Sequence, residues 1–243
     1  MRELIFAAAL ALLPCADAGA GQSTVRFETA DGCSIEAFYL APAKGSYVFI
    51  NTHGLGSDRN EWEPLHGALK KRGLGYLALD MRGHGGSRGC AGKEVSYRAF
   101  SDAEWNAASG DIEAAAAWLL KKKVPAAKMV FCGASIGANL SAKAAAEGAI
   151  KPAALVLLSP GVEYHGVKTE PYFAAARPPR IFIAAAEDDG YAWQSGNYLA
   201  VAAARQGLPA VFKAGRSGHG VNMFKGSGLT AEIIDWVLAP GKK

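Results

Sequence analysis

The chain has 243 residues and is 50% hydrophobic, 20% charged and 9% aromatic, with 26 Lys+Arg against 22 Asp+Glu and a net charge of +4. This apolar fraction, with charges that nearly cancel, excludes an intrinsically disordered chain and fits one large globular domain. The net charge is too small and too dispersed for the basic patch that nucleic-acid binding requires, so we expect no nucleic-acid partner.

The N-terminus has the three parts of a secretory signal peptide. Arg2 precedes an uncharged apolar run from Leu4 to Leu13, and the small residues of 14–20 follow. Because the apolar run is too short to span a bilayer, we expect no stable membrane anchor and a periplasmic or secreted protein.

Residues 1–18 form the predicted signal peptide, with cleavage after residue 18 or, as the alternative, after residue 20. The mature domain then covers 21–243. Cys15 raises the question of a lipoprotein, but a directly preceding Pro14 fits a lipid-attachment site poorly, and we do not expect one.

Three cysteines remain after cleavage, namely Cys33, Cys90 and Cys132, and three thiols cannot all pair within one chain. A bridge between Cys33 and Cys90 can form in an oxidising compartment, although the sequence alone does not establish it. No Cys-x-x-Cys or His-Glu-x-x-His spacing occurs, and the dinucleotide-like run Gly226–Ala231 lies too near the C-terminus to begin a βαβ unit. We expect neither a metal nor a cofactor.

The mature chain begins with a predicted hairpin, in which Val25–Thr29 and Ser34–Leu40 flank the turn Asp31-Gly32. Short apolar runs bounded by Gly, Pro, Asp or Ser then predict buried parallel strands. These runs are Tyr47–Asn51, Gly75–Asp80, Lys128–Cys132, Ala154–Ser159, Arg180–Ala185 and Ala210–Lys213.

Helical segments lie between these strands, and together they predict a single α/β domain. The expected sheet is eight-stranded and mostly parallel, with the antiparallel hairpin at its start and helices on both faces. Ligands of such sheets bind at the carboxyl ends of the strands, so catalytic residues are expected there. The predicted helices are Trp62–Arg72, Asn106–Lys122, Ile136–Glu147, Tyr191–Gln206 and Thr230–Leu238.

The run Gly133–Gly137 matches G-x-S-x-G, the sharp strand-to-helix turn that presents a nucleophilic serine. Ser135 follows a predicted strand directly and precedes a predicted helix, as that turn requires. A second match, centred on Ser87, lies several residues beyond its strand and has no helical periodicity after it. We therefore interpret Ser135 as the nucleophile and Ser87 as a loop residue.

A serine nucleophile needs a histidine as general base. His219 follows the last strand by a short glycine-rich loop and precedes the last helix, which suits this role. His53 also follows a strand, but its glycine neighbour indicates a different role, and His84 fits a turn. His66 falls inside a helix and His165 in a connection, so His219 is the predicted base.

The base in turn needs a carboxylate that fixes its tautomer. Glu187, Asp188 and Asp189 cluster after one strand, about 30 residues before His219. The chain order serine, acid, histidine is the one expected for this type of turn. Asp189 also suits the cap of the following helix, which is a structural alternative for it.

These residues make the sequence resemble the α/β-hydrolase superfamily from Val25 to the final helix. Thr52-His53-Gly54-Leu55-Gly56, the run Leu79–Ser87 and the serine turn resemble the serine-aminopeptidase and monoacylglycerol-lipase-like branch, with dienelactone-hydrolase-like enzymes as near relatives.

The resemblance implies Ser135 as nucleophile, His219 as general base and Asp189 as acid, with Asp188 as the alternative acid. It also implies an oxyanion hole formed by the backbone N–H groups of Leu55 and Ile136, two donors that can stabilise the developing oxyanion.

Relatives with a helical cap insert it after the strand that ends near Ser159. Here only Pro160–Pro179 separates that strand from the next, which allows a small flap and predicts a shallow, open site. Tyr164, Tyr172 and Phe173 are candidates for lining it, with packing onto the sheet as the alternative.

We therefore expect an exported serine hydrolase that cleaves small carboxylic esters through an acyl-enzyme. A peptidase, an amidase or a dienelactone-type hydrolase would use the same triad. A binding protein that kept the fold without turnover is the alternative from another class.

Overall fold

The computed structural model describes residues 21–176 and 180–240. The predicted signal peptide, its cleavage positions and Cys15 lie outside the described residues. Within these ranges, none of the helices combines the length and apolar character needed to cross a membrane.

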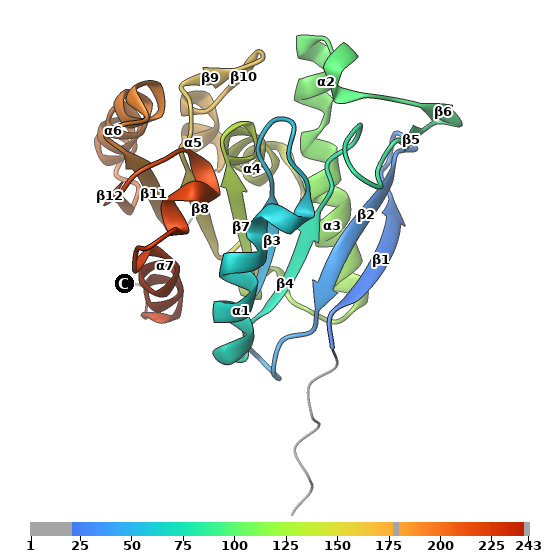
Figure 1. Ribbon diagram of the computed structural model, residues 1–243, viewed down its shortest axis with the longest axis horizontal. Coiled ribbons are helices and arrows are strands. Elements are labelled where there is room, and N and C mark those ends of the chain that lie inside the picture. The colour runs from blue at the N-terminus through green and yellow to red at the C-terminus, as the bar shows by residue number, and fades with distance from the viewer. Residues whose placement is uncertain (1–20, 177–179, 241–243) are drawn as a thin grey trace, which may run out of the picture.

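The core is a mixed eight-stranded sheet with the order β1-β2-β4-β3-β7-β8-β11-β12 (Figure 1). β1 pairs antiparallel with β2 and β2 with β4, and the remaining neighbours are parallel. This confirms the predicted fold, but the prediction that Ala210–Lys213 forms a buried strand is wrong, because β12 lies at the edge of the sheet and its residues are half-buried or exposed. The strands are β1 (Ser23–Glu28), β2 (Ser34–Leu40), β3 (Val48–Thr52), β4 (Gly75–Leu79), β7 (Met129–Ala134), β8 (Ala154–Leu158), β11 (Ile181–Ala186) and β12 (Ala210–Gly215).

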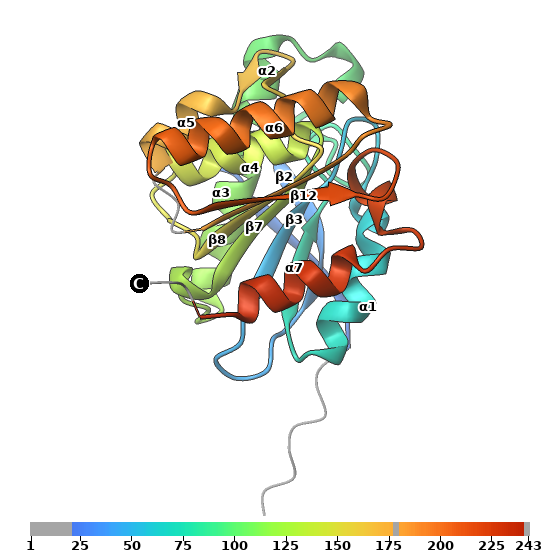
Figure 2. The same ribbon diagram turned by 90° about the vertical axis from the view of Figure 1, so that its left-hand side faces the viewer.

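Helices cover both faces of this sheet (Figure 2). Two layers of buried apolar side chains separate them from it. One layer lies under α3, α4 and α6, and the other lies under α1 and α7. These helices are α1 (Glu63–Lys71), α3 (Ser109–Lys121), α4 (Ile136–Glu147), α6 (Gly190–Arg205) and α7 (Leu229–Leu238). A short 3-10 helix, Arg59–Trp62, precedes α1, and others cover Tyr97–Ala99, Ala126–Lys128 and Gly220–Phe224.

The helix predicted over Asn106–Lys122 is in fact two helices. α2 covers Asp102–Ala107 and ends before α3 begins. Ser101 caps α2 through a capping box with Glu104, because each side chain bonds the other residue's backbone N–H. This reciprocal cap begins the helical region four residues earlier than the apolar periodicity predicted.

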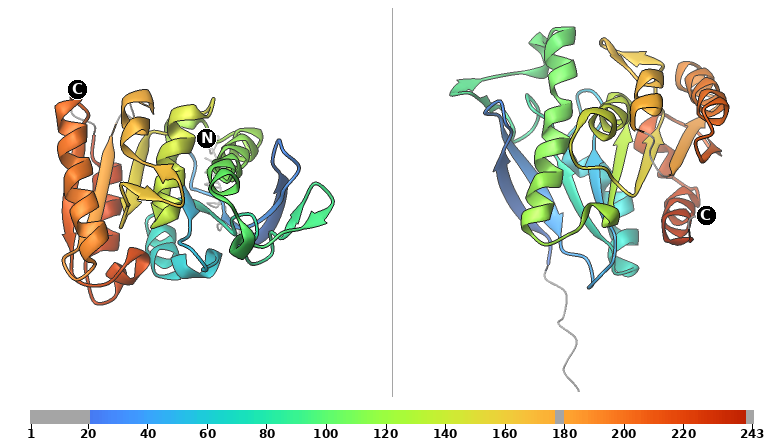
Figure 3. Two further views of the ribbon diagram at one scale, coloured as in Figure 1. Left: turned by 90° about the horizontal axis from the view of Figure 1, so that it is seen from above. Right: turned by 180° about the vertical axis from the view of Figure 1, so that it is seen from behind.

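Two small hairpins and one helix stand outside the predicted elements. They are β5 (Gly89–Cys90) with β6 (Lys93–Glu94), β9 (Glu163–Tyr164) with β10 (Val167–Lys168), and α5 (Glu170–Ala176). A disulfide joins Cys33 to Cys90 and ties the β5–β6 hairpin to the turn between β1 and β2, at the edge of the molecule seen in Figure 3. Cys132 is a buried free thiol.

Candidate active site

Ser135 lies at the sharp turn between β7 and α4, in a strained backbone conformation with φ 55° and ψ −128°. Its flanking glycines are sterically required. A Cβ atom on Gly133 would lie 2.1 Å from the carbonyl oxygen of Gly137, and one on Gly137 would lie 2.3 Å from the carbonyl oxygen of Thr52. The Ser135 N–H donates to the Leu158 carbonyl at 2.8 Å, which fixes the turn against β8.

Ser87, the centre of the second G-x-S-x-G match, has a role in holding the structure together. It lies in the loop after β4, as predicted, and is completely buried. Its Oγ accepts the Glu36 backbone N–H at 2.8 Å, so the side chain joins this loop to β2.

The structure pairs His219 with Asp189. The Nδ1 atom of His219 lies 2.6 Å from Oδ2 of Asp189, which leaves Nε2 as the ring nitrogen available to a nucleophile. The Asp189 side chain is 16% exposed and that of His219 is 44% exposed. The His219–Asp189 contact thus lies near the molecular surface, at the carboxyl ends of β11 and β12.

Asp188, the alternative acid, has different partners. Its carboxylate accepts the Ser217 hydroxyl at 2.5 Å and the Gly218 N–H at 2.9 Å. These bonds lower the pKa of Asp188 and hold the loop that leads to His219. Asp188 therefore shapes the histidine loop and Asp189 contacts the histidine itself.

The serine turn, the histidine loop and the loop after β3 converge at the carboxyl ends of the strands. The N–H of Gly220, next to His219, donates to Ser159 Oγ at 2.8 Å. A Cβ on Gly220 would lie 3.3 Å from Cβ of Ala134, and one on Gly54 would lie 3.3 Å from Cβ of Ser135.

His53 orients the peptide between Gly54 and Leu55. The Met81 N–H donates to His53 Nε2 at 3.0 Å, so Nε2 carries no proton and Nδ1–H donates to the Gly54 carbonyl at 2.7 Å. Burial lowers the pKa of His53 to about 3, which keeps this tautomer neutral. Because a trans peptide points its C=O and N–H in opposite directions, the hold on Gly54 C=O directs the Leu55 N–H away from His53.

The neighbouring N–H groups of this loop are already bonded. Gly54 N–H donates to Glu61 Oε1 at 3.1 Å, Gly56 N–H to His84 Nε2 at 3.4 Å, and Ser57 N–H to the Gly54 carbonyl at 3.2 Å. For Leu55 N–H, and likewise for Ile136 N–H at the start of α4, no acceptor is found in the described parts of the chain. These are the two donors that the resemblance assigns to the oxyanion hole.

Glu61 is a residue of this loop that the sequence did not single out. Burial raises the pKa of its carboxyl to about 7, against the lowering effect of hydrogen bonds from Ser57 and Gly54. No cation is among the groups that shift it. No sequence signal distinguishes Glu61 from an ordinary acidic residue at a helix start.

The loop after β4 is bonded to the segment that follows β3. Asp80 accepts the Arg59 N–H at 2.8 Å, forms an ion pair with the Arg59 guanidinium and accepts the Gly86 N–H at 2.7 Å. A Cβ on Gly85, whose φ is +43°, would lie 2.0 Å from the Asp80 carboxylate. The glycines after His84 are therefore needed for the chain to close around Asp80.

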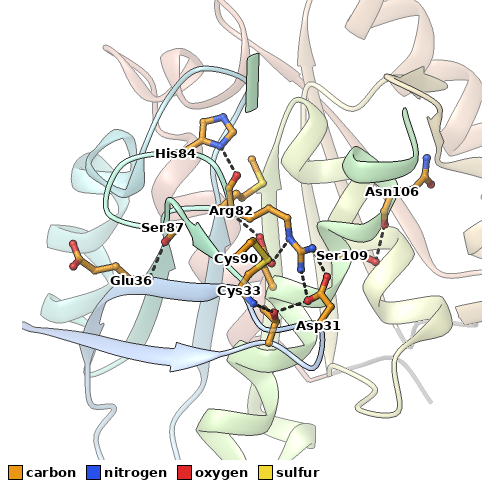
Figure 4. A network of polar contacts seen from close by, with 12 residues as sticks. Asp31, Cys33, Glu36, Arg82, His84, Ser87, Cys90, Asn106 and Ser109 are labelled. Carbon is orange, nitrogen blue, oxygen red and sulfur yellow. Dashed lines mark hydrogen bonds and ion pairs between the residues drawn. A yellow bond between two sulfur atoms is a disulfide. The ribbon is translucent and has the colours of Figure 1, made fainter. Parts of the chain in front are cut away.

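Arg82 anchors the same loop through a buried ion-pair network (Figure 4). Its Nε lies 2.8 Å from Asp111, which is completely buried on α3, and its Nη1 lies 2.5 Å from Asp31. Asp31 and the disulfide cysteine Cys33 belong to the turn between β1 and β2, so this network and the disulfide fix the same corner of the molecule.

The three aromatic candidates of the β8–β11 connection have different positions. The Tyr164 hydroxyl donates to the Ser159 carbonyl at 3.4 Å, one residue after the Leu158 carbonyl that accepts the Ser135 N–H. The Tyr172 hydroxyl instead accepts Lys143 Nζ at 3.2 Å, and Phe173 is completely buried in the apolar layer that includes α4. Of the three, only Tyr164 borders the site, because Phe173 has become a core residue and Tyr172 packs beside α4.

In the described ranges, no group of three or more His, Cys, Asp and Glu side chains is arranged to hold a metal ion. The glycine contacts bring the serine turn, the loop of Leu55 and the histidine loop together, and these loops supply a serine, a histidine-carboxylate pair and two backbone donors. Such a set can perform nucleophilic acyl transfer.

Residues 43–186 match the family model described as serine aminopeptidase, S33. The chain belongs to this family. It is therefore a serine hydrolase of the α/β-hydrolase superfamily, as its motifs predicted. No curated protein sequence is a significant match.

Solved structures of esterases and related hydrolases share the fold of this S33 family member. An esterase from Pyrococcus furiosus superposes with a TM-score of 0.72 at 16% identity, over 89% of each chain. S-formylglutathione hydrolase from Staphylococcus aureus superposes with a TM-score of 0.69 at 14% identity, over 94% of this chain and all of the other. An esterase from Exiguobacterium antarcticum gives 0.64 at 12% identity, over 89% of this chain. At such identities the likeness concerns the fold alone.

Proposed function

We propose that this serine hydrolase cleaves small carboxylic esters with Ser135 as nucleophile, His219 as general base and Asp189 as the acid that orients the base. The observation that carries this proposal is the 2.6 Å contact between His219 Nδ1 and Asp189, beside a serine held in a strained strand-to-helix turn.

In the proposed reaction, His219 Nε2 takes the hydroxyl proton as Ser135 Oγ attacks the ester carbonyl. The negative charge that develops on the carbonyl oxygen is stabilised by the backbone N–H groups of Leu55 and Ile136. Collapse of the tetrahedral intermediate breaks the bond to the alcohol, which leaves with the proton from His219. Water then attacks the acyl-enzyme carbonyl as His219 Nε2 takes its proton. Collapse of this second intermediate returns the proton to Ser135 Oγ and releases the carboxylic acid.

The fixed backbone of the two donors supports this assignment. An oriented donor can lower the barrier by about 3 kcal/mol, because it is already directed at the developing charge and need not reorganise. His53, Glu61 and His84 restrain the peptides around Leu55, and the glycine contacts of the serine turn restrain Ile136.

The substrate assignment rests on two features. The connection between β8 and β11 consists of the short hairpin β9–β10 and α5, which fits a site that is open to small substrates. The esterases among the structural neighbours favour an ester, although amide hydrolysis uses the same groups.

We also propose that the protein is exported to the periplasm or secreted. The disulfide between Cys33 and Cys90 supports this, because such bonds persist in oxidising compartments. The proposal fails if the N-terminus of the protein purified from its native host begins at residue 1.

Hydrolysis of a series of esters from acetate to laurate by wild type and by Ser135→Ala tests the proposed function. We expect turnover of the short esters and a fall of at least about 10⁴-fold in kcat for Ser135→Ala. Ser87→Ala is the matched control and should keep its activity. Equal kcat values for wild type and Ser135→Ala would refute the proposal, and preferential cleavage of peptides would change its substrate class.

A further inference from the structure

The β8–β11 connection places one phenol beside the serine turn. Tyr164 is the last residue of β9, and its hydroxyl donates to the Ser159 carbonyl oxygen at 3.4 Å. Ser159 follows Leu158, whose carbonyl accepts the Ser135 N–H, and Ser159 Oγ accepts the N–H of Gly220, next to His219. The phenol therefore lies where the serine turn and the histidine loop meet, and Ser135 and Asp189 are among the groups that shift its pKa.

The Tyr164 ring is held in this position from two sides. A Cβ on Gly161 would lie only 2.7 Å from the ring, so the ring packs directly on the backbone there. On another side the ring meets Tyr191 edge to face at 5.5 Å. The Tyr191 hydroxyl accepts the Glu163 N–H at 3.3 Å and donates to the Glu163 carbonyl at 2.8 Å.

This clamp couples the hairpin to the acid. Tyr191 lies in the first turn of α6, two residues after Asp189, so the same turn carries the acid and anchors the strand of Tyr164. The β9–β10 hairpin accordingly stands over the carboxyl ends of β8 and β11 (Figure 1).

The sheet order determines from which side Tyr164 approaches the nucleophile. Ser135 follows β7, and the loop of Leu55 follows β3 on one side of it. β8, β11 and β12 lie on the other side, and the segments that follow them carry Tyr164, Asp189 and His219. The phenol is therefore on the side of the base, opposite the backbone donors of the oxyanion hole.

On the side of the base, the leaving alcohol must take its proton from His219. Burial raises the pKa of Tyr164, so its hydroxyl keeps its proton at neutral pH and can exchange its long 3.4 Å bond to the Ser159 carbonyl for a hydrogen bond to a substrate. A donor at this place would stabilise the negative charge that builds on the leaving oxygen as the bond to carbon breaks.

We propose that the Tyr164 hydroxyl donates a hydrogen bond to the leaving-group oxygen when the tetrahedral intermediate collapses. This role rests on the proposed triad. The carbonyl re-forms, and the electron pair of the breaking C–O bond remains on the leaving oxygen. This oxygen takes the proton from His219 Nε2. Tyr164 keeps its own proton throughout, so its contribution is electrostatic.

The test compares Tyr164→Phe with wild type on esters of one acid and alcohols of graded acidity. Aliphatic alcohols are poor leaving groups and need the donor, so we expect kcat/KM to fall about 10-fold or more for their esters. The p-nitrophenyl ester, whose leaving group needs little stabilisation, should lose less than about 3-fold. Tyr172→Phe, from the same connection but bonded to Lys143, is the control and should change neither value.

An equal fall for both kinds of ester, or no fall for aliphatic esters, would overturn the role of Tyr164. Labelling of Ser135 by a fluorophosphonate is measured in the same variant and should persist. Activity that survives in Ser135→Ala would refute the proposed triad itself, whatever Tyr164→Phe shows, so the two failures are distinguishable.

Discussion

Ser135 and Leu55 follow β7 and β3, in which every residue is buried, whereas His219 follows β12, whose residues are half-buried or exposed. The serine turn is restrained by glycines that no larger residue can replace. The histidine loop is restrained by a few hydrogen bonds that Asp188, Asp189 and Ser159 accept from it. One half of the site is thus built into the core and the other is attached to the surface.

This difference predicts that changes in the two halves have different consequences. On the acid-base side a substitution should remove activity and leave stability nearly intact, because His219 is exposed and Asp189 is only partly buried. On the nucleophile side a substitution should lower stability together with activity, because the site and the core share the same atoms.

On the acid-base side, the largest expected effect on activity comes from the acid. Asp189→Asn replaces the carboxylate by a neutral carboxamide of the same shape, which cannot stabilise the charged imidazole. The value of kcat should therefore fall by about 10³- to 10⁴-fold at a nearly unchanged melting temperature. Asp188→Asn is the matched control in steady-state assays. It should lose less than about 10-fold, because Asp188 contacts Ser217 and Gly218 and not His219. A larger loss for Asp188→Asn than for Asp189→Asn would show that Asp188, and not Asp189, is the acid that orients His219.

Gly137→Ala probes the buried half. The added Cβ would lie 2.3 Å from the Thr52 carbonyl oxygen and 2.5 Å from that of His53, so β3 and α4 would have to separate. We expect the free energy of unfolding to fall by at least about 3 kcal/mol, measured by urea denaturation. Gly190→Ala, where a Cβ meets nothing within 4 Å beside the acid, is the control and should change stability by less than about 1 kcal/mol. Similar losses at both glycines would contradict the difference between the halves.

Glu61 gives the buried half a pH dependence. Its pKa is raised to about 7 from an ordinary value of 4.5, so between these pH values the folded chain holds a proton that the unfolded chain has lost. The contribution of Glu61 to the free energy of unfolding is therefore fully present below pH 4.5 and is lost as the pH rises through 7.

Glu61→Gln removes this titration and should still accept the Gly54 N–H. Relative to wild type, the variant should gain up to about 3 kcal/mol in the free energy of unfolding between pH 4.5 and pH 8. Urea denaturation of both proteins at the two pH values measures the change. A difference between them that is independent of pH would contradict the assignment.

The parts of the molecule that could be predicted from sequence are those with a strict local requirement. Six strands of the central sheet follow from short apolar runs and the first two from the hairpin pattern, and the serine turn follows from glycines placed between a strand and a helix. Apolar periodicity does not predict α2, whose start is marked by the capping box of Ser101 and Glu104.

The contacts of Glu61 and Tyr164 were not predictable, because they depend on how loops from different strands meet. Glu61 is an acidic residue in a polar segment, and only the approach of Gly54 reveals its role. The sequence offers Tyr164, Tyr172 and Phe173 as equal candidates, and only the β9–β10 hairpin brings Tyr164 to Ser159, beside the serine turn.

The most direct test of the central claim is the site of covalent modification by a fluorophosphonate. Intact-mass measurement of the labelled wild-type protein, followed by peptide mapping, should find one adduct per chain, located on Ser135, and none in Ser135→Ala. The account is contradicted if the adduct maps to Ser87 or another residue, or if Ser135→Ala is labelled as fully as wild type.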